Sequence, residues 1–188
     1  RLLLTLARPY YIYDMFAQSK FPKMKFIDPY NEYKMARAGA EEMWHNVIKL
    51  SPKSQCIQIL GNHDSRPYKR MAEKAPDLAP FIDLKTPFEF DGVTTYHDTS
   101  MEVVIEGIVF QHGFRLKLGD QMKFNLMPSV GGHTHTGGAN FMSIRNRMLW
   151  ELNAGYCANP LDDALKYTPQ RWVRWTHGCG LVDNLGPR

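Results

Sequence analysis

The chain has 188 residues, of which 44% are hydrophobic and 22% are charged, and its formal net charge is +4. A chain of this length can bury roughly two thirds of its unfolded surface, so we expect a single globular domain over residues 1–188 and exclude a largely disordered protein. The positive excess is small and spread out, so it neither requires nor excludes a nucleic acid or another anionic partner.

The opening residues 2–7 form a short apolar run that stops before Pro9. This run is too short to span a membrane and shows no targeting signal, so it favours a strand of an α/β sheet or a cut-off segment. The three cysteines are far apart and lack the spacing of a zinc finger. We therefore predict a reduced, cytoplasmic protein that does not associate with membranes.

Two elements lead into the first polar motif. Apolar residues recur at helical spacing over residues 31–50 and predict a helix that ends before Pro52. Residues 56–60 then form a short apolar strand. The sequence Gly-Asn-His-Asp at residues 61–64 begins where this strand stops, which is where open α/β sheets place their ligands.

A helix follows this motif and extends to about Ala75, with the side chain of Asp64 or Ser65 as its predicted cap. Residues 101–105 and 108–110 then flank Glu106-Gly107 as a hairpin, and His112-Gly113 comes directly after its second strand.

The last third of the chain alternates strand-like runs with glycine-rich loops. Residues 118–126 fit neither periodicity clearly, and Val130 leads into a loop that contains Gly-His-Thr-His at residues 132–135. Residues 141–152 and 180–182 are predicted to be further strands.

These loops carry the side chains that bind divalent metals. A metal that hydrolyses a phosphoester needs imidazole, amide or carboxylate ligands that converge from several loops on an open pocket. Glycines beside the motifs permit the tight backbone conformations that such loops need. Four residues in this pattern are candidate ligands: Asn62, His112, His133 and His135.

His63 follows a candidate ligand in the chain and cannot easily face the same metal. We therefore predict that it contacts the substrate and protonates the leaving oxygen, with Asp64 orienting its imidazole. A lone histidine is more often an ordinary core or surface residue, which is how we interpret His45, His97 and His177. The joint occurrence of the other histidines in ordered loops favours a site.

The ordered motifs resemble those of the calcineurin-like metallophosphoesterase superfamily over roughly residues 14–182, and residues 13–22 are similar to its phage and bacterial members. The resemblance implies an α/β fold with a two-sheet β-sandwich flanked by helices, in four α/β/β/α layers. It also implies a two-metal site, with His135 on one ion. The other ion would take Asn62, His112 and His133, and His63 would contact the phosphate and leaving group.

The chain departs from this family pattern at its start. No Asp-x-His precedes Asp14, so the domain is expected to be N-terminally incomplete, and Tyr11 stands where the Gly-Asp-x-x-Asp motif has its bridging carboxylate. Asp14 is the last Asp of that motif and the only acidic metal ligand that remains. We therefore expect one or two divalent ions, of manganese, zinc, iron or nickel, and a single ion if no other ligand replaces the missing ones.

The predicted function is metal-dependent hydrolysis of phosphoesters, as a phosphodiesterase or nuclease-like enzyme that uses a metal-activated water assisted by His63. One alternative is a non-catalytic or single-metal protein of this fold that binds without cleaving. A third interpretation is a three-histidine zinc hydrolase built on His112, His133 and His135. The partner is a phosphoester, with nucleic acid and nucleotides among the candidates, and the sequence does not specify the oligomeric state.

Overall fold

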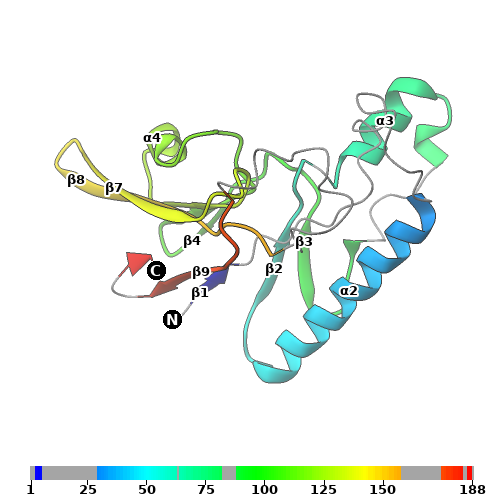
Figure 1. Cartoon of the computed structure of the whole chain (residues 1–188), viewed down its shortest axis with the longest axis horizontal. Coiled ribbons are helices and arrows are strands. Elements are labelled where there is room, and N and C mark those ends of the chain that lie inside the picture. Colours follow the sequence, from blue (N-terminus) through cyan, green and yellow to red (C-terminus); the bar gives the residue numbers. More distant parts are fainter. Residues whose placement is uncertain are drawn as a thin grey trace. The chain divides into compact units, whose positions relative to one another are not determined.

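A computed structural model describes residues 3–5, 29–62, 64–81, 88–157, 175–183 and 186–187. The protein is mixed α/β, and its chain divides into two compact units (Figure 1). One unit holds residues 1–9 and 100–188, and the other holds residues 10–99. The single domain expected over residues 1–188 stays a prediction.

In its described residues, the unit of residues 10–99 contains one long helix, a two-stranded parallel sheet and two short helical segments. Strand β2 pairs with β3 from Cys56↔Val93 to Ile59↔Tyr96. The helix predicted over residues 31–50 and the strand predicted over 56–60 are both confirmed. The elements are α2 (Pro29–Leu50), β2 (Cys56–Ile59), α3 (Arg66–Lys74), the 3-10 helix η1 (Ala79–Phe81) and β3 (Val93–Tyr96).

Gln58 joins the long helix to this sheet. Its side chain is buried on β2, where Oε1 accepts a hydrogen bond of 2.9 Å from Trp44 Nε1 and Nε2 donates one of 3.0 Å to the Phe88 carbonyl. Both polar ends of a buried amide therefore have partners, which removes the cost of taking it out of water.

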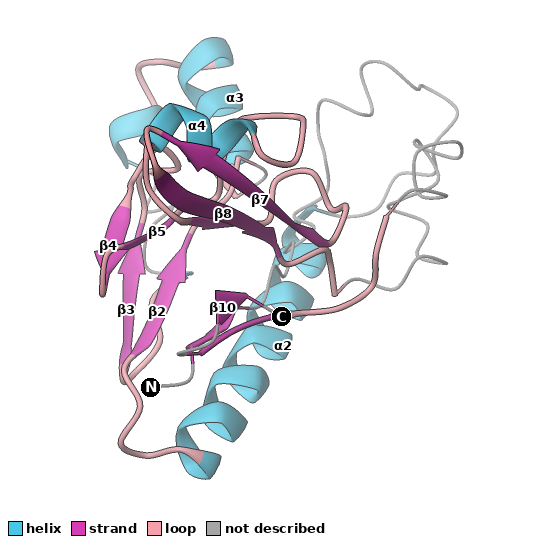
Figure 2. Ribbon diagram, turned by 90° about the vertical axis from the view of Figure 1, so that its left-hand side faces the viewer, coloured by secondary structure: helices cyan, strands magenta, loops and turns pink. Residues whose placement is uncertain are grey.

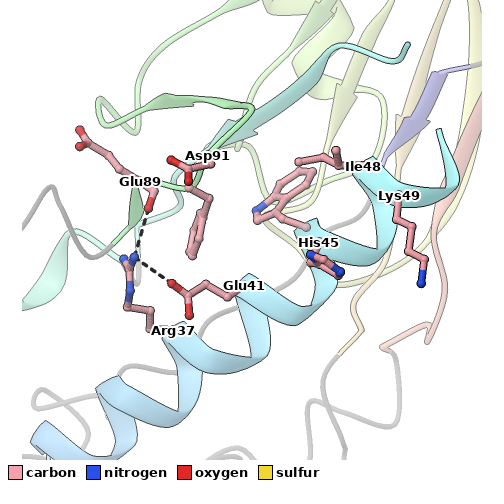
Figure 3. A pocket seen from close by; sticks show the side chains of 9 residues that line it. Arg37, Glu41, His45, Ile48, Lys49, Glu89 and Asp91 are labelled. Carbon is pink, nitrogen blue, oxygen red and sulfur yellow. Dashed lines mark hydrogen bonds and ion pairs between the residues drawn. The ribbon is translucent and has the colours of Figure 1, made fainter. Parts of the chain in front are cut away.

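A hollow of about 480 Å³ opens beside α2 in the same unit (Figure 3). Arg37 lies at one end, where Nη2 donates to Glu41 Oε1 at 3.0 Å and to the Glu89 carbonyl at 3.4 Å. Its guanidinium also lies 5.1 Å from the centre of the Phe90 ring. The charge of Arg37 is thus already engaged within the unit.

The start of α3 differs from the prediction of a side-chain cap. Ser65 occupies the cap position, but its backbone is helical and its hydroxyl donates to the Asn62 carbonyl at 3.0 Å. The carboxylate of Asp64 instead accepts a bond from the Gly61 amide. Pro67, within the first turn, has no N–H group, so one fewer amide needs a partner there.

The other unit contains a five-stranded mixed sheet in the order β4-β5-β6-β8-β7 and a small antiparallel sheet in the order β1-β9-β10 (Figures 1 and 2). Its elements are β1 (Leu3–Thr5), β4 (Val103–Ile105), β5 (Ile108–Phe110), α4 (Asp120–Asn125), β6 (Ser129–Gly131), β7 (Gly138–Ile144), β8 (Arg147–Asn153), β9 (Gly180–Asp183) and β10 (Gly186–Pro187). Val130, Leu152 and Val182 form a buried cluster that includes residues of both sheets.

Two tight hairpins shape the larger sheet. The predicted turn at Glu106-Gly107 is confirmed, with φ values of 51° and 77°. The strand structure predicted within residues 141–152 is confirmed, but it is divided into β7 and β8, because Arg145 and Asn146 adopt φ values of 50° and 59° and turn the chain between them. Positive φ at both central residues gives the twist that two-residue hairpins favour, and asparagine tolerates it well.

A buried carboxylate attaches the short helix α4 to this sheet. Glu151 lies on β8, and its Oε2 accepts hydrogen bonds from the amides of Gln121 at 2.8 Å and Met122 at 3.0 Å. These amides belong to the first turn of α4, which has no partners for them within the helix. These two bonds stabilise a helix within residues 118–126, a segment that the sequence left undecided.

Replacing Glu151 by alanine should destabilise the protein by about 3 kcal/mol, because two buried amides lose their acceptor. The free energy of unfolding would be measured by urea titration of the full chain. The control is Glu102→Ala, since Glu102 is an exposed carboxylate of the same unit and its loss should change stability by less than about 0.5 kcal/mol. Equal effects of the two substitutions would contradict the role of Glu151.

Candidate metal centre

Two neighbouring parallel strands bring two of the predicted ligands together. Strands β5 and β6 pair in parallel at Val109↔Ser129 and Phe110↔Val130, so the loops after them leave the same edge of the sheet. The backbone ladder continues past the strands, where the amides of Gly132 and His133 donate to the His112 carbonyl at 3.2 and 3.1 Å.

The rings of His112 and His133 lie in direct contact. His133 Nδ1 is 3.0 Å from His112 Nε2, and the two ring planes are inclined at 83° with their centres 4.9 Å apart. Both side chains are partly buried. The structure therefore brings together two residues that the sequence analysis assigned to one ion.

His112 is held in its neutral form. Burial, followed by repulsion from the nearby His133 and His135, lowers its pKa to about 3. A neutral imidazole has a free ring nitrogen that can bind a metal, whereas a protonated one has none. At neutral pH His112 is thus in the state that a ligand needs.

The separation of the two ring nitrogens fits one divalent ion. Metal–imidazole bonds of about 2.0–2.1 Å place two ligands about 3 Å apart when they meet at a right angle, and about 3.4 Å apart at the tetrahedral angle. The 3.0 Å between His112 and His133 is a hydrogen bond in this structure, and it also matches the first case. Within the described ranges, no group of three or more His, Cys, Asp or Glu side chains is arranged to hold an ion.

His135 lies in the same loop as His133 but its ring contacts an aromatic cluster. Its ring centre is 4.6 Å from that of Trp175 in an edge-to-face arrangement, and 6.2 Å from that of Tyr156. Burial, followed by repulsion from His133, lowers its pKa to about 4. Its φ of 60° is unusual for a residue with a side chain, and such strain often accompanies functional loops.

Sequence reasoning did not find the residues that support this loop. Tyr156 and Trp175 pack beside His135, and Asn153 Nδ2 donates to Thr134 Oγ1 at 2.8 Å. Backbone bonds join the segments, from the Thr176 amide to the His135 carbonyl and from the Tyr156 amide to the Thr176 carbonyl, both 3.0 Å. The sequence offers one signal, which is that the polar residue Asn153 ends the strand-like run of β8, the strand that pairs with β6.

The Gly-Asn-His-Asp motif belongs to the unit of residues 10–99. The Gly61 amide donates to Asp64 Oδ2 at 2.7 Å, which closes the loop between β2 and α3. The other oxygen, Oδ1, is buried and has no hydrogen-bond partner among the described residues. Burial raises the pKa of Asp64 to about 7 and outweighs the hydrogen bonds from the Gly61 amide and its own amide.

Of three further predicted site residues, the structure describes Asn62 but not His63 or Asp14. Asn62 is partly buried in the loop that follows β2, and its carbonyl accepts the bond from Ser65. His63 and Asp14 lie outside the described residues, as do Tyr11 and Pro9. Their assigned roles stay predictions.

Comparison of the chain with protein-family models, with curated proteins and with solved structures finds no match. The resemblance to metallophosphoesterases therefore depends on the order and spacing of the motifs alone. None of the helices in the described part of the chain is both long enough and apolar enough to cross a membrane.

Substitution of Gly155 can test how closely the segment around Thr176, which donates to the His135 carbonyl, packs against the chain. A Cβ at this position would collide with the Thr176 carbonyl oxygen, whereas a Cβ at Gly107 would meet open space. Both glycines have similar positive φ, 75° and 77°. Gly155→Ala should lower the free energy of unfolding by about 3 kcal/mol or more and Gly107→Ala by about 1 kcal/mol, as judged by urea titration. A loss at Gly155 no larger than that at Gly107 would disprove the close packing.

Proposed function

We propose that this chain is a metal-dependent phosphoesterase that acts on phosphodiesters. The observation that supports this best is the 3.0 Å approach of His112 Nε2 and His133 Nδ1 at the carboxyl ends of two parallel strands. Two imidazole nitrogens at this separation match two ligands of one divalent ion. The ordered Gly-Asn-His-Asp, His-Gly and Gly-His-x-His motifs add the reaction class to the metal.

In this proposal His112 and His133 hold the ion, and Asn62 is a further ligand assigned from its motif. A bound divalent ion lowers the pKa of a coordinated water and neutralises charge on phosphoryl oxygens. The chain's own residues provide the rest. His63 donates a proton to the leaving oxygen, and the buried Oδ1 of Asp64 provides an acceptor that can fix an imidazole N–H.

The proposed fold family brings a two-sheet β-sandwich flanked by helices in four layers. The five-stranded mixed sheet, with its ligands in the loops after β5 and β6, is compatible with that architecture. Parallel strands followed by polar loops are the usual source of active-site residues in α/β proteins.

A second candidate function is a protein that binds a single ion without cleaving phosphoesters. Two observations support it. The ring of His135 packs on Trp175, and within the described residues only His112 and His133 form a direct histidine–histidine contact. Tyr11 in place of the bridging carboxylate points the same way. Both candidates predict one ion per chain, and they differ only in turnover.

Metal binding by purified apo-protein tests the histidine pair. Calorimetric titration with zinc or manganese should show one equivalent per chain, and His112→Ala or His133→Ala should weaken binding about a hundredfold or more, since even outer-shell changes cost ten- to a hundredfold. His45→Ala is the matched control, because His45 is an exposed histidine on α2. Unchanged affinity in both pair variants would rule out this site.

Turnover separates the two candidate functions. With manganese, the chain should hydrolyse bis(p-nitrophenyl) phosphate, and His63→Ala should lower kcat by about a hundredfold or more while metal affinity stays the same, because it removes only the proton donor. Normal activity in His63→Ala would end the role given to His63. Full metal binding with no turnover in the native chain would favour the non-catalytic alternative.

A further inference from the structure

Two phenylalanines form an exposed aromatic surface just after the histidine pair. Phe114 and Phe124 remain 50% and 55% exposed, and their rings meet edge to face with centres 5.1 Å apart. Phe114 follows His112-Gly113, and Phe124 lies on α4. The Phe114 amide donates to Gln121 Oε1 at 3.3 Å, which joins the two segments. Exposed aromatic rings on two segments that a hydrogen bond joins are typical of a binding surface.

Arg115 lies over both rings. Its guanidinium carbon is 4.7 Å from the centre of the Phe114 ring and 4.8 Å from that of Phe124. Cation–π contact with two rings restricts the movement of the guanidinium, and its N–H groups can still bind anionic oxygens. We call Phe114, Arg115 and Phe124 the aromatic platform.

The surroundings of the platform favour an anionic ligand. Within the described ranges, no carboxylate forms an ion pair with Arg115 or with the exposed Lys117. Lys123, on α4, is paired with Asp120 at 3.1 Å. Arg115 over exposed aromatic rings, with Lys117 two residues further along the chain, combines the two features that bind single-stranded nucleic acid, namely base stacking and contact with phosphates.

The platform is also close to the proposed reaction centre. Phe114 is two residues beyond His112, so their Cα atoms lie within about 7.6 Å of each other. A chain with a base on the platform would therefore carry its neighbouring phosphates toward the histidine pair. An aromatic stack at this distance can hold a polymeric substrate in register with the hydrolytic site.

We propose that the aromatic platform binds a base of single-stranded nucleic acid, with Arg115 on an adjacent phosphate, and that this makes single-stranded nucleic acid the substrate class of the site. The substrate assignment rests on the proposed phosphodiesterase function, whereas the binding itself does not. A protein partner on the same rings is the alternative that remains if no oligonucleotide binds.

Binding is measured by fluorescence anisotropy of a short fluorescein-labelled oligothymidylate with the full chain in EDTA, so that neither metal nor cleavage is involved. Phe114→Ala and Phe124→Ala should each weaken binding about tenfold, and Phe124→Trp should retain it, since stacking tolerates any aromatic ring. Arg115→Gln should reduce the slope of log affinity against log salt by about 0.7, the value of one lost phosphate contact.

Phe141→Ala is the matched control. Phe141 is 56% exposed on β7 in the same unit. Its neighbour Asn140 faces the loop before α4, where its side chain donates to the Leu118 carbonyl at 3.2 Å. Successive strand residues point to opposite faces of a sheet, so Phe141 points away from that loop. This variant should bind the oligonucleotide as the native chain does.

Two results would overturn the platform: no oligonucleotide binding by the native chain, or binding by both phenylalanine-to-alanine variants as tight as that of the native chain. The first would leave a protein as the partner for these rings. Hydrolysis of bis(p-nitrophenyl) phosphate is assayed in parallel. Oligonucleotide binding without hydrolysis would reject the proposed function and keep the platform. Hydrolysis by the native chain, together with unchanged oligonucleotide binding by Phe114→Ala and Phe124→Ala, would keep the proposed function and reject the platform.

Discussion

The parallel pairing of β5 with β6 is the constraint on which the histidine pair depends. It places the ends of both strands at one edge of the sheet, and the amides of Gly132 and His133 extend the ladder to the His112 carbonyl. The two side chains are therefore positioned by backbone hydrogen bonds and not by side-chain packing alone. Side chains held in this way are preorganised, so a metal that bound them would not have to supply the free energy of ordering the loops.

A chain of buried polar groups connects this edge of the sheet with α4. Glu151 accepts the first amides of the helix, and Gln121 binds both the Phe114 amide and Asn125, which in turn donates to Ser129 Oγ on β6. Glu151, Gln121 and Ser129 are almost fully buried. Since such groups are costly when unpaired, their mutual satisfaction selects one arrangement of the helix, the strands and the loop after His112.

Local patterns in the sequence predicted the elements that local forces determine. The apolar spacing of residues 31–50 and the Glu106-Gly107 turn were sufficient for α2 and for the β4–β5 hairpin. The six residues of α4 escaped prediction because their amides are capped by Glu151 from a distant strand. In the candidate site, motif order predicted that His112 and His133 would meet, but the packing of His135 against Trp175 depends on tertiary structure and left no periodic signal.

The pairing of β1 with β9 has a consequence for the order in which the chain can fold. Leu3 lies opposite Val182, so this small sheet joins residues from both ends of the sequence, and one of the two compact units is discontinuous. The other unit is a continuous stretch and can complete its contacts while the ribosome is still adding later residues. The discontinuous unit must wait for β9 and must close a loop of nearly the whole chain, which is slow for topological reasons. Val182 of β9 belongs to the buried cluster with Val130 and Leu152, so the packing of β6 and β8 is complete only when β9 has joined the unit.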